Sequence, residues 1–207
     1  MARTPKPSGR RSPSFESRLD RRTGRRVARQ RLLVVCGTEV TERDYVQGLK
    51  SSVRNPAVSV KIVERPKAPS QVVAYTAKLL ASAAEEYDQA WCVFDVDEFT
   101  DIDRAVTDAD HSGIGIALSN PCFELWLLLH FTDHRSHAPS CTHLVPHLDR
   151  HTAGGYSKTG LDFRAYESTW REAVRRAREL APEGKEPEVN PSTGMWRLAL
   201  AIGGPAT

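Results

Sequence analysis

Asp95 and Asp97 lie at the end of a predicted strand, where their carboxylates could bind a metal ion. Asp95 and Asp97 come at the end of the apolar segment 90–96. Because strand side chains alternate between two faces, both carboxylates point to the same side. Mg²⁺ takes such oxygen ligands together with substrate phosphates, and a cation relieves the repulsion between the carboxylates. The pair predicts a Mg²⁺ or Mn²⁺ site, although both residues could instead cap the following helix or face water.

A second acidic segment, CGTEVTE at 36–42, follows the first apolar segment. The first strand-to-helix turn of an open α/β sheet is the usual position for phosphate or metal chemistry. Glu39 lies in this turn and can reach Asp95 and Asp97, which makes it the third candidate metal ligand and a candidate catalytic residue. Glu42 falls in the first helical turn, where the helix dipole already favours a negative charge, so a structural role explains it equally well.

Two further charged residues, Glu124 and Lys158, are candidate catalytic residues. Glu124 lies among apolar residues of the segment 121–131, and a buried carboxylate needs a partner because an unpaired buried charge is costly. A cation, Lys158 or an arginine could supply that partner, either in the site or as a structural ion pair. Lys158 ends the loop GGYSK at 154–158, where it could contact a phosphate or simply be solvated.

The cysteines and histidines give weaker signals. The four cysteines form no C-x-x-C pair, which predicts neither a disulfide framework nor a zinc ribbon and favours a reducing cytoplasm. Cys36, Cys92 and Cys122 lie in or beside apolar segments and are predicted to be core residues. Six histidines occur between 130 and 151. Those at 143, 147 and 151 would share one helix face, for which a polar surface is a better explanation than zinc.

The elements that must position these residues alternate between strand and helix. Apolar or alternating segments predict strands at 32–36, 58–63, 90–96 and 113–119. Helices are expected from Thr41, as an N-cap with Asp44 in a capping box, from Ser70 to about 86, and near 100–109. This order predicts an α/β fold with a mostly parallel sheet of about four strands and helices on both faces. Beyond it, a helical C-terminal part is expected at 121–131, with Pro121 in the first turn, and at 141–151, 162–181 and 192–202.

Charge divides the 207 residues into two parts. Residues 1–31 carry a balance of +9 and the rest a balance of −6. We therefore expect a basic, disordered tail at 1–30 and one domain at 31–207. The tail either solubilises the protein or neutralises nucleic-acid phosphates, through Arg21, Arg22, Arg25, Arg26 and Arg29. No apolar run approaches the roughly 18 residues of a membrane span, and no secretion signal is present, so we expect no membrane association.

Several segments in order resemble the RloB-like family: RLLVVCGTEVTERDY, WCVFDVDEF, IALSNPCFELWLLLHF, GGYSKTGLDF and NPSTGMWRL, from about 31 to 202. That family resembles Toprim-fold proteins and is associated with restriction-modification and abortive-infection loci, often beside an ATPase. The resemblance implies a Toprim-like site, in which an acid after the first strand and the D-x-D after the third bind Mg²⁺. It further implies a phage-defence nuclease or nuclease subunit that acts on DNA or RNA and has an ATPase partner.

One position departs from this pattern. The family's first motif, C-E-G-x-x-T-E-x-x-Y, places Gly37 of this chain where the family has its glutamate. Glu39 could replace that acid and preserve activity. Otherwise the chain would be a non-catalytic subunit that binds nucleic acid or the ATPase. Gly37 could also require a positive φ, which a glutamate tolerates poorly.

Overall fold

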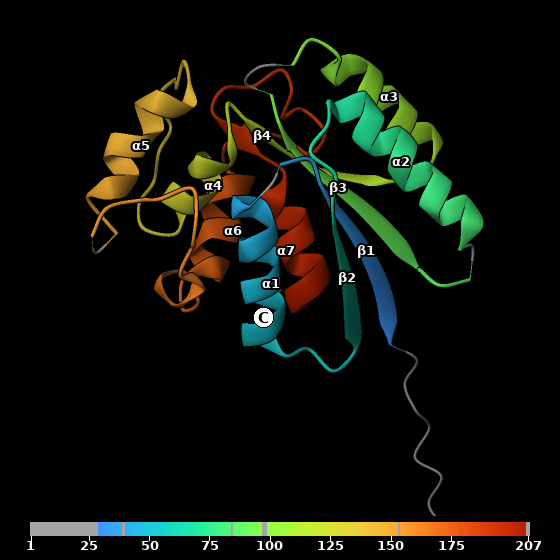
Figure 1. Cartoon of the computed structure of the whole chain (residues 1–207). Coiled ribbons are helices and arrows are strands. Elements are labelled where there is room, and N and C mark those ends of the chain that lie inside the picture. Colours follow the sequence, from blue (N-terminus) through green and yellow to red (C-terminus); the bar gives the residue numbers. More distant parts are fainter. Residues whose placement is uncertain (1–28, 39, 84, 97–98, 153, 206–207) are drawn as a thin grey trace, which may run out of the picture.

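A five-stranded sheet forms the centre of the molecule, in the order β2-β1-β3-β4-β5 (Figure 1). The computed structural model describes residues 29–205, apart from positions 39, 84, 97–98 and 153. The first four strands pair in parallel, and the short fifth strand is antiparallel to β4. The mostly parallel α/β prediction is confirmed. The strands are β1 (Gln30–Cys36), β2 (Val58–Glu64), β3 (Gln89–Asp95), β4 (Gly115–Asn120) and β5 (Ser192–Thr193).

Helices cover both faces of the sheet, as Figure 1 shows. One face packs against α2 (Pro69–Ser82) and α3 (Ile102–His111), and the other against α1 (Thr41–Val53) and α7 (Met195–Gly203). Leu33 and Val35 of β1 belong to the first of these cores, and Leu32 and Val34 to the second. Because both faces of β1 are buried, its sequence is continuously apolar rather than alternating.

The start of α1 differs from the expected capping box. Val40 is the N-cap, and no side chain in the described part of the chain caps the helix. The Thr41 hydroxyl instead donates a hydrogen bond to the backbone carbonyl of Lys158, at 2.8 Å. The capping-box prediction was therefore wrong, because the hydroxyl that would cap the helix fixes a distant loop.

The C-terminal part is helical but more divided than the sequence suggests. It contains α4 (Phe123–Leu129), α5 (Cys141–Asp149), a 3₁₀ turn η1 (Phe163–Ala165), α6 (Trp170–Arg178) and α7. The segment expected as one helix at 162–181 is split between η1 and α6, and the segment at 192–202 begins with β5. Pro121 precedes α4 rather than lying in its first turn, since Cys122 is the N-cap.

Two Asn-Pro segments meet beside β4 and β5. Both Asn-Pro peptide bonds, at 120–121 and 190–191, are cis. The Asn190 side chain donates to Asn120 Oδ1 at 3.0 Å and to the carbonyl of Ala138 at 2.9 Å. Asn120 in turn donates to the carbonyl of Glu186 at 3.2 Å. These contacts hold the last strand against the sheet, next to the point where α4 begins.

The cysteines correct another prediction. Cys122 and Cys141 form a disulfide, with their Cα atoms 5.8 Å apart, although their spacing in sequence predicted none. The bridge joins the residue before α4 to the first residue of α5. Cys36 and Cys92 are free and buried, as expected for core residues. Cys122 is also buried.

The described part of the chain begins just before β1. The chain enters β1 at the amino edge, where Arg29 is exposed. The other tail arginines and the predicted disorder of the tail lie outside the described residues. In the described part of the chain, no helix is long and apolar enough to cross a membrane.

Candidate active site at the carboxyl edge of the sheet

A cavity of about 250 Å³ opens at the carboxyl edge of the parallel strands. The turn after β1, the last residue of β3, the start of α4 and the loop after α5 all contribute to its wall. This is the edge where ligands bind in open α/β sheets. The lining residues are Thr38, Val40, Thr41, Glu42, Asp95, Phe123, Glu124, Lys158 and Thr159.

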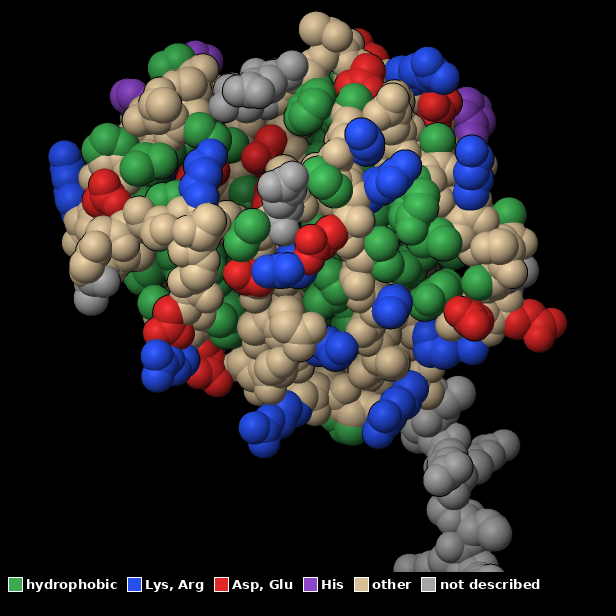
Figure 2. Space-filling view, in the orientation of Figure 1, with side chains coloured by type: hydrophobic (Ala, Val, Ile, Leu, Met, Phe, Trp, Pro, Cys, Tyr) green, Lys and Arg blue, Asp and Glu red, His purple; other side chains and the backbone are tan. Residues whose placement is uncertain are grey.

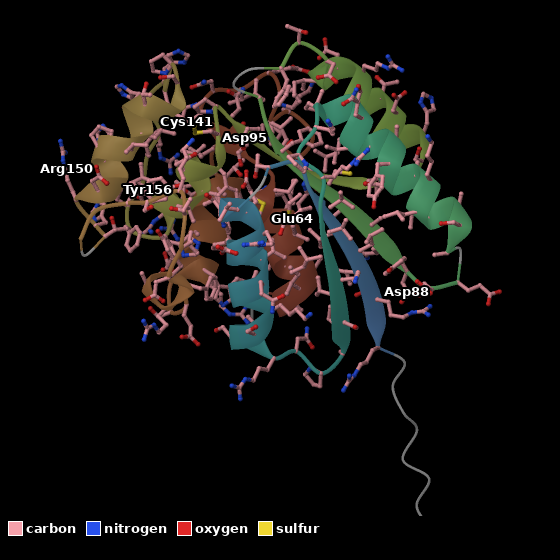
Figure 3. The ribbon with its side chains drawn as sticks, viewed as in Figure 1. Glu64, Asp88, Asp95, Cys141, Arg150 and Tyr156 are labelled. Atoms are coloured by element: carbon pink, nitrogen blue, oxygen red, sulfur yellow. A yellow bond between two sulfur atoms is a disulfide. The ribbon has the colours of Figure 1, made fainter. Side chains whose placement is uncertain are left out.

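Asp95 ends β3 and faces this cavity. Its Oδ1 atom is buried and has no hydrogen-bond partner among the described residues. Burial raises the pKa of Asp95 well above its ordinary value, and the nearby carboxylates of Glu42 and Glu124 raise it further. In Figure 3, Asp95 lies toward the end of the sheet near α4, whereas Asp88 lies at the opposite end. Asp95 is therefore an acid with an unsatisfied oxygen.

Glu42 reaches the same cavity from the first turn of α1. It is 3% exposed, and the Thr38 hydroxyl donates a hydrogen bond to its carboxylate. Burial is the main cause that raises its pKa, and Glu124 adds to the shift, whereas Thr38 and Lys158 oppose it. The sequence left the role of Glu42 open. Its position in the first helical turn after β1 is the sequence feature that could have assigned Glu42 to the site.

Glu124 is held by two side chains, Tyr156 and Lys158. Its Oε1 atom accepts a hydrogen bond from the Tyr156 hydroxyl at 3.0 Å and lies 3.4 Å from Lys158 Nζ. Its Oε2 atom lies 3.1 Å from Cys141 Sγ. The Glu124 side chain is 5% exposed, while the Lys158 side chain is 66% exposed, so solvent screens this ion pair.

Tyr156 is a site residue that the sequence did not single out. Burial is the main cause that raises the pKa of its hydroxyl, and the charge of Glu124 adds to it, so the hydroxyl remains a donor. Cys141 and Tyr156 lie on the same side of the molecule as Asp95 in Figure 3. The loop motif GGYSK therefore brings a hydroxyl and an ammonium group to one carboxylate.

The charges in this cavity favour cation binding. Glu42, Asp95 and Glu124 face a single described lysine, Lys158, among the lining residues. Carboxylate oxygens and the unsatisfied Asp95 Oδ1 fit a hard ion such as Mg²⁺, which needs only one or two carboxylates. Among the described residues, however, these three carboxylates do not all bring ligand atoms within 4.8 Å of one another. Glu39 and Asp97, the other predicted ligands, lie outside the described residues.

Gly37 sits where β1 leaves the sheet and approaches β3 closely. Its N–H donates to the Val93 carbonyl at 2.7 Å. A Cβ at this position would lie 3.1 Å from that carbonyl oxygen and 3.3 Å from Phe94 Cβ. Its φ is not positive, so the expected conformational requirement was wrong. The obstacle to a side chain here is crowding.

The histidines do not form the expected row. Helix α5 ends at Asp149, so His151 lies beyond it and stacks on Phe131, with ring centroids 5.3 Å apart. The ring of His147 lies instead 5.7 Å from that of His143 and 5.5 Å from that of His134. His143 is exposed on the surface of α5, as the polar-face interpretation predicts.

The sheet and its acidic cavity together define an α/β protein of the Rossmannoid kind with a candidate cation site at the carboxyl edge. The family model described as RloB-like protein matches residues 32–202. The chain belongs to this family. None of the curated proteins and none of the solved structures matches the chain.

Proposed function

We propose that this protein is a Mg²⁺-dependent nuclease or nuclease subunit of a phage-defence system, of the abortive-infection or restriction-associated kind. The observation that carries this proposal is the buried Asp95 Oδ1, which has no hydrogen-bond partner in the described part of the chain and lies in a cavity shared with Glu42 and Glu124. Asp95, together with Asp97 and Glu39, would hold Mg²⁺ or Mn²⁺. The ion would polarise the phosphate and help to position a water or the leaving oxygen.

The side chains around the cavity support phosphodiester chemistry. Lys158 is mostly exposed on a loop at the rim, where its ammonium can pair with a phosphate. Glu42 holds a proton at a higher pH than an ordinary glutamate, because it is buried beside other acids. It can therefore exchange a proton with the attacking water or the leaving oxygen. Tyr156 fixes Glu124 and so the wall against which the substrate would lie.

A basic surface supports nucleic acid, DNA or RNA, as the substrate. Figure 2 shows Lys and Arg side chains over β1 and β2, from the lower end of α1 to the start of α2. Four of them are exposed and have no carboxylate within ion-pair distance among the described residues: Arg54, Lys61, Arg65 and Lys67. Arg65 lies at the carboxyl edge, because its N–H donates to the Cys36 carbonyl at 2.8 Å. This surface would extend from the base of the tail to the cavity.

The glycine at position 37, where the family has an acid, supports a second candidate function. The position leaves little room for a side chain, and the family's acid is absent there. In this alternative, the chain is a non-catalytic subunit that binds nucleic acid or an ATPase partner and retains a degenerate site.

A cleavage assay with the full chain tests both proposals. Purified protein is incubated with DNA or RNA and Mg²⁺ or Mn²⁺, alone and with an ATPase encoded nearby. We expect cleavage by the wild type and none by Asp95→Asn. Asp88→Asn is the matched control, because Asp88 lies at the other end of β3 and pairs with Arg31. Absence of cleavage by the wild type under all these conditions, with intact partner binding, would favour the non-catalytic subunit.

A further inference from the structure

We propose that Cys122, Glu124 and Cys141 form a second metal site, for a borderline or soft divalent ion such as Zn²⁺. One ligand atom from each residue lies within 4.8 Å of the other two. They are the only such set of three among the described histidine, cysteine and acidic residues. Cys122 and Glu124 are buried at the start of α4, and Cys141 begins α5. The site would join two helices that pack against each other.

The two oxygens of Glu124 have different surroundings. Oε1 is taken by Tyr156 and Lys158, whereas Oε2 faces Cys141 Sγ and accepts no hydrogen bond from a nitrogen or oxygen of the described residues. A ligating carboxylate is typically oriented in this way, with one oxygen held by neighbours and the other free for the metal. Tyr156 and Lys158 would therefore be positioning residues for the metal ligand.

The donor set separates this site from the acidic cavity. Two thiolates and one carboxylate suit Zn²⁺, which binds sulfur at about 2.3 Å, and do not suit Mg²⁺. Three protein ligands also leave the fourth tetrahedral position open, as in catalytic rather than structural zinc sites. Glu124 lines the cavity, so its orientation would connect the two sites.

The metal would bind only the reduced chain, because Cys122 and Cys141 are joined here as a disulfide. A dithiol reductant supplies two electrons and two protons to the S–S bond and is itself oxidised to a disulfide. The resulting thiols each lose one proton when they bind the metal. Oxidation and metal binding would thus exclude each other at this pair of cysteines.

Metal titration of the reduced full chain tests the site without measuring cleavage. The protein is reduced with a phosphine, which is then removed, and titrated with Co²⁺ as a spectroscopic probe and with Zn²⁺ as competitor. We expect one thiolate-bound ion per chain, counted from a thiolate-to-cobalt charge-transfer band; an ion held only by the carboxylates of the acidic cavity does not give this band. Cys122→Ser and Cys141→Ser should lose the band. Cys92→Ala, which removes a buried free cysteine, should keep it.

Three further variants keep the test decisive if a cysteine variant folds poorly. Tyr156→Phe retains all three ligands but frees Glu124, so we expect affinity to fall by about tenfold. His143→Ala/His147→Ala should leave affinity unchanged, because those histidines are not ligands in this proposal. Absence of a charge-transfer band in the folded, reduced wild type would overturn the proposal, as would a band that survives Cys141→Ser. Asp95→Asn should bind Zn²⁺ normally, so this result is independent of the nuclease proposal.

Discussion

One aspartate lies at each end of strand β3, and the two differ in their hydrogen bonds and in the direction of their pKa shifts. Asp88, just before the strand, accepts a hydrogen bond from the backbone N–H of Arg31 at 2.7 Å and pairs with its guanidinium at 3.3 Å. Those hydrogen bonds lower the pKa of Asp88. Asp95, the last residue of the strand, has a raised pKa and one oxygen without a hydrogen-bond partner among the residues that the structure describes. The same residue type is satisfied at the amino edge and left unsatisfied at the carboxyl edge, which is typical of a functional site.

The largest effect is expected from removing the basic tail. The chain enters β1 at the amino edge of the sheet, whereas the acidic cavity lies at the carboxyl edge. Deleting residues 1–25 should weaken nucleic-acid binding and flatten its salt dependence, by about 0.7 to 0.9 in logarithmic slope for each phosphate that the tail neutralises in the full chain. Fluorescence anisotropy with a labelled oligonucleotide at several salt concentrations measures both effects.

Surface variants show whether the tail acts together with β2. Lys61→Ala and Arg65→Ala should each lower the slope further, whereas Lys185→Ala should not, since Lys185 is already paired with Glu188 at 2.8 Å. An unchanged slope after tail deletion would assign the tail to solubility or expression.

A stability measurement tests the two aspartates directly. Asp95→Asn removes a buried charge with little change of shape, so we expect the free energy of unfolding to rise by about 1 to 3 kcal/mol at pH 7. Asp88→Asn should instead lower stability slightly, because it weakens an exposed pair. Urea denaturation in the presence of a chelator measures both. If Asp95→Asn destabilises the protein, its carboxylate is satisfied in solution and the contrast fails.

The sequence was sufficient for the parts of the fold that bury apolar side chains. The apolar run of β1 predicted a strand buried on both faces, and the apolar segment 90–96 predicted a third strand with Asp95 near its carboxyl end. The disulfide was not predictable, because Cys122 and Cys141 are 19 residues apart and meet only when α5 packs on α4. Strand β5 has two residues and no periodic signal. Tyr156 reaches Glu124 from a loop, whose course depends on tertiary contacts such as the bond from Thr41.

Gly37→Glu tests whether the carboxyl edge lacks one acid. The new Cβ would approach the Val93 carbonyl and Phe94 closely, so we expect a loss of about 1 to 3 kcal/mol in unfolding free energy. Gly37→Ala measures this crowding alone. If Glu39 already serves as the first acid, the added carboxylate should not increase cleavage beyond the wild-type rate. A folded Gly37→Glu variant that cleaves faster would instead identify a degenerate site.

The smallest expected effect is a difference in pH dependence between the two aspartates. A raised pKa means that folded Asp95 binds a proton at a pH where the unfolded chain, with an aspartate pKa near about 3.9, does not. The stability gain of Asp95→Asn should therefore shrink as the pH falls from 7 toward 4, because the wild-type carboxylate becomes neutral. For Asp88 the pKa is lowered, so the stabilising pair is present at neutral pH and is lost only as the pH falls through that lowered value. Urea denaturation of the wild type and both variants at matched pH values checks the two signs. A gain from Asp95→Asn that stays constant down to pH 4 would show that Asp95 does not take up its proton in this range, and the two ends of β3 would then differ in burial but not in ionisation.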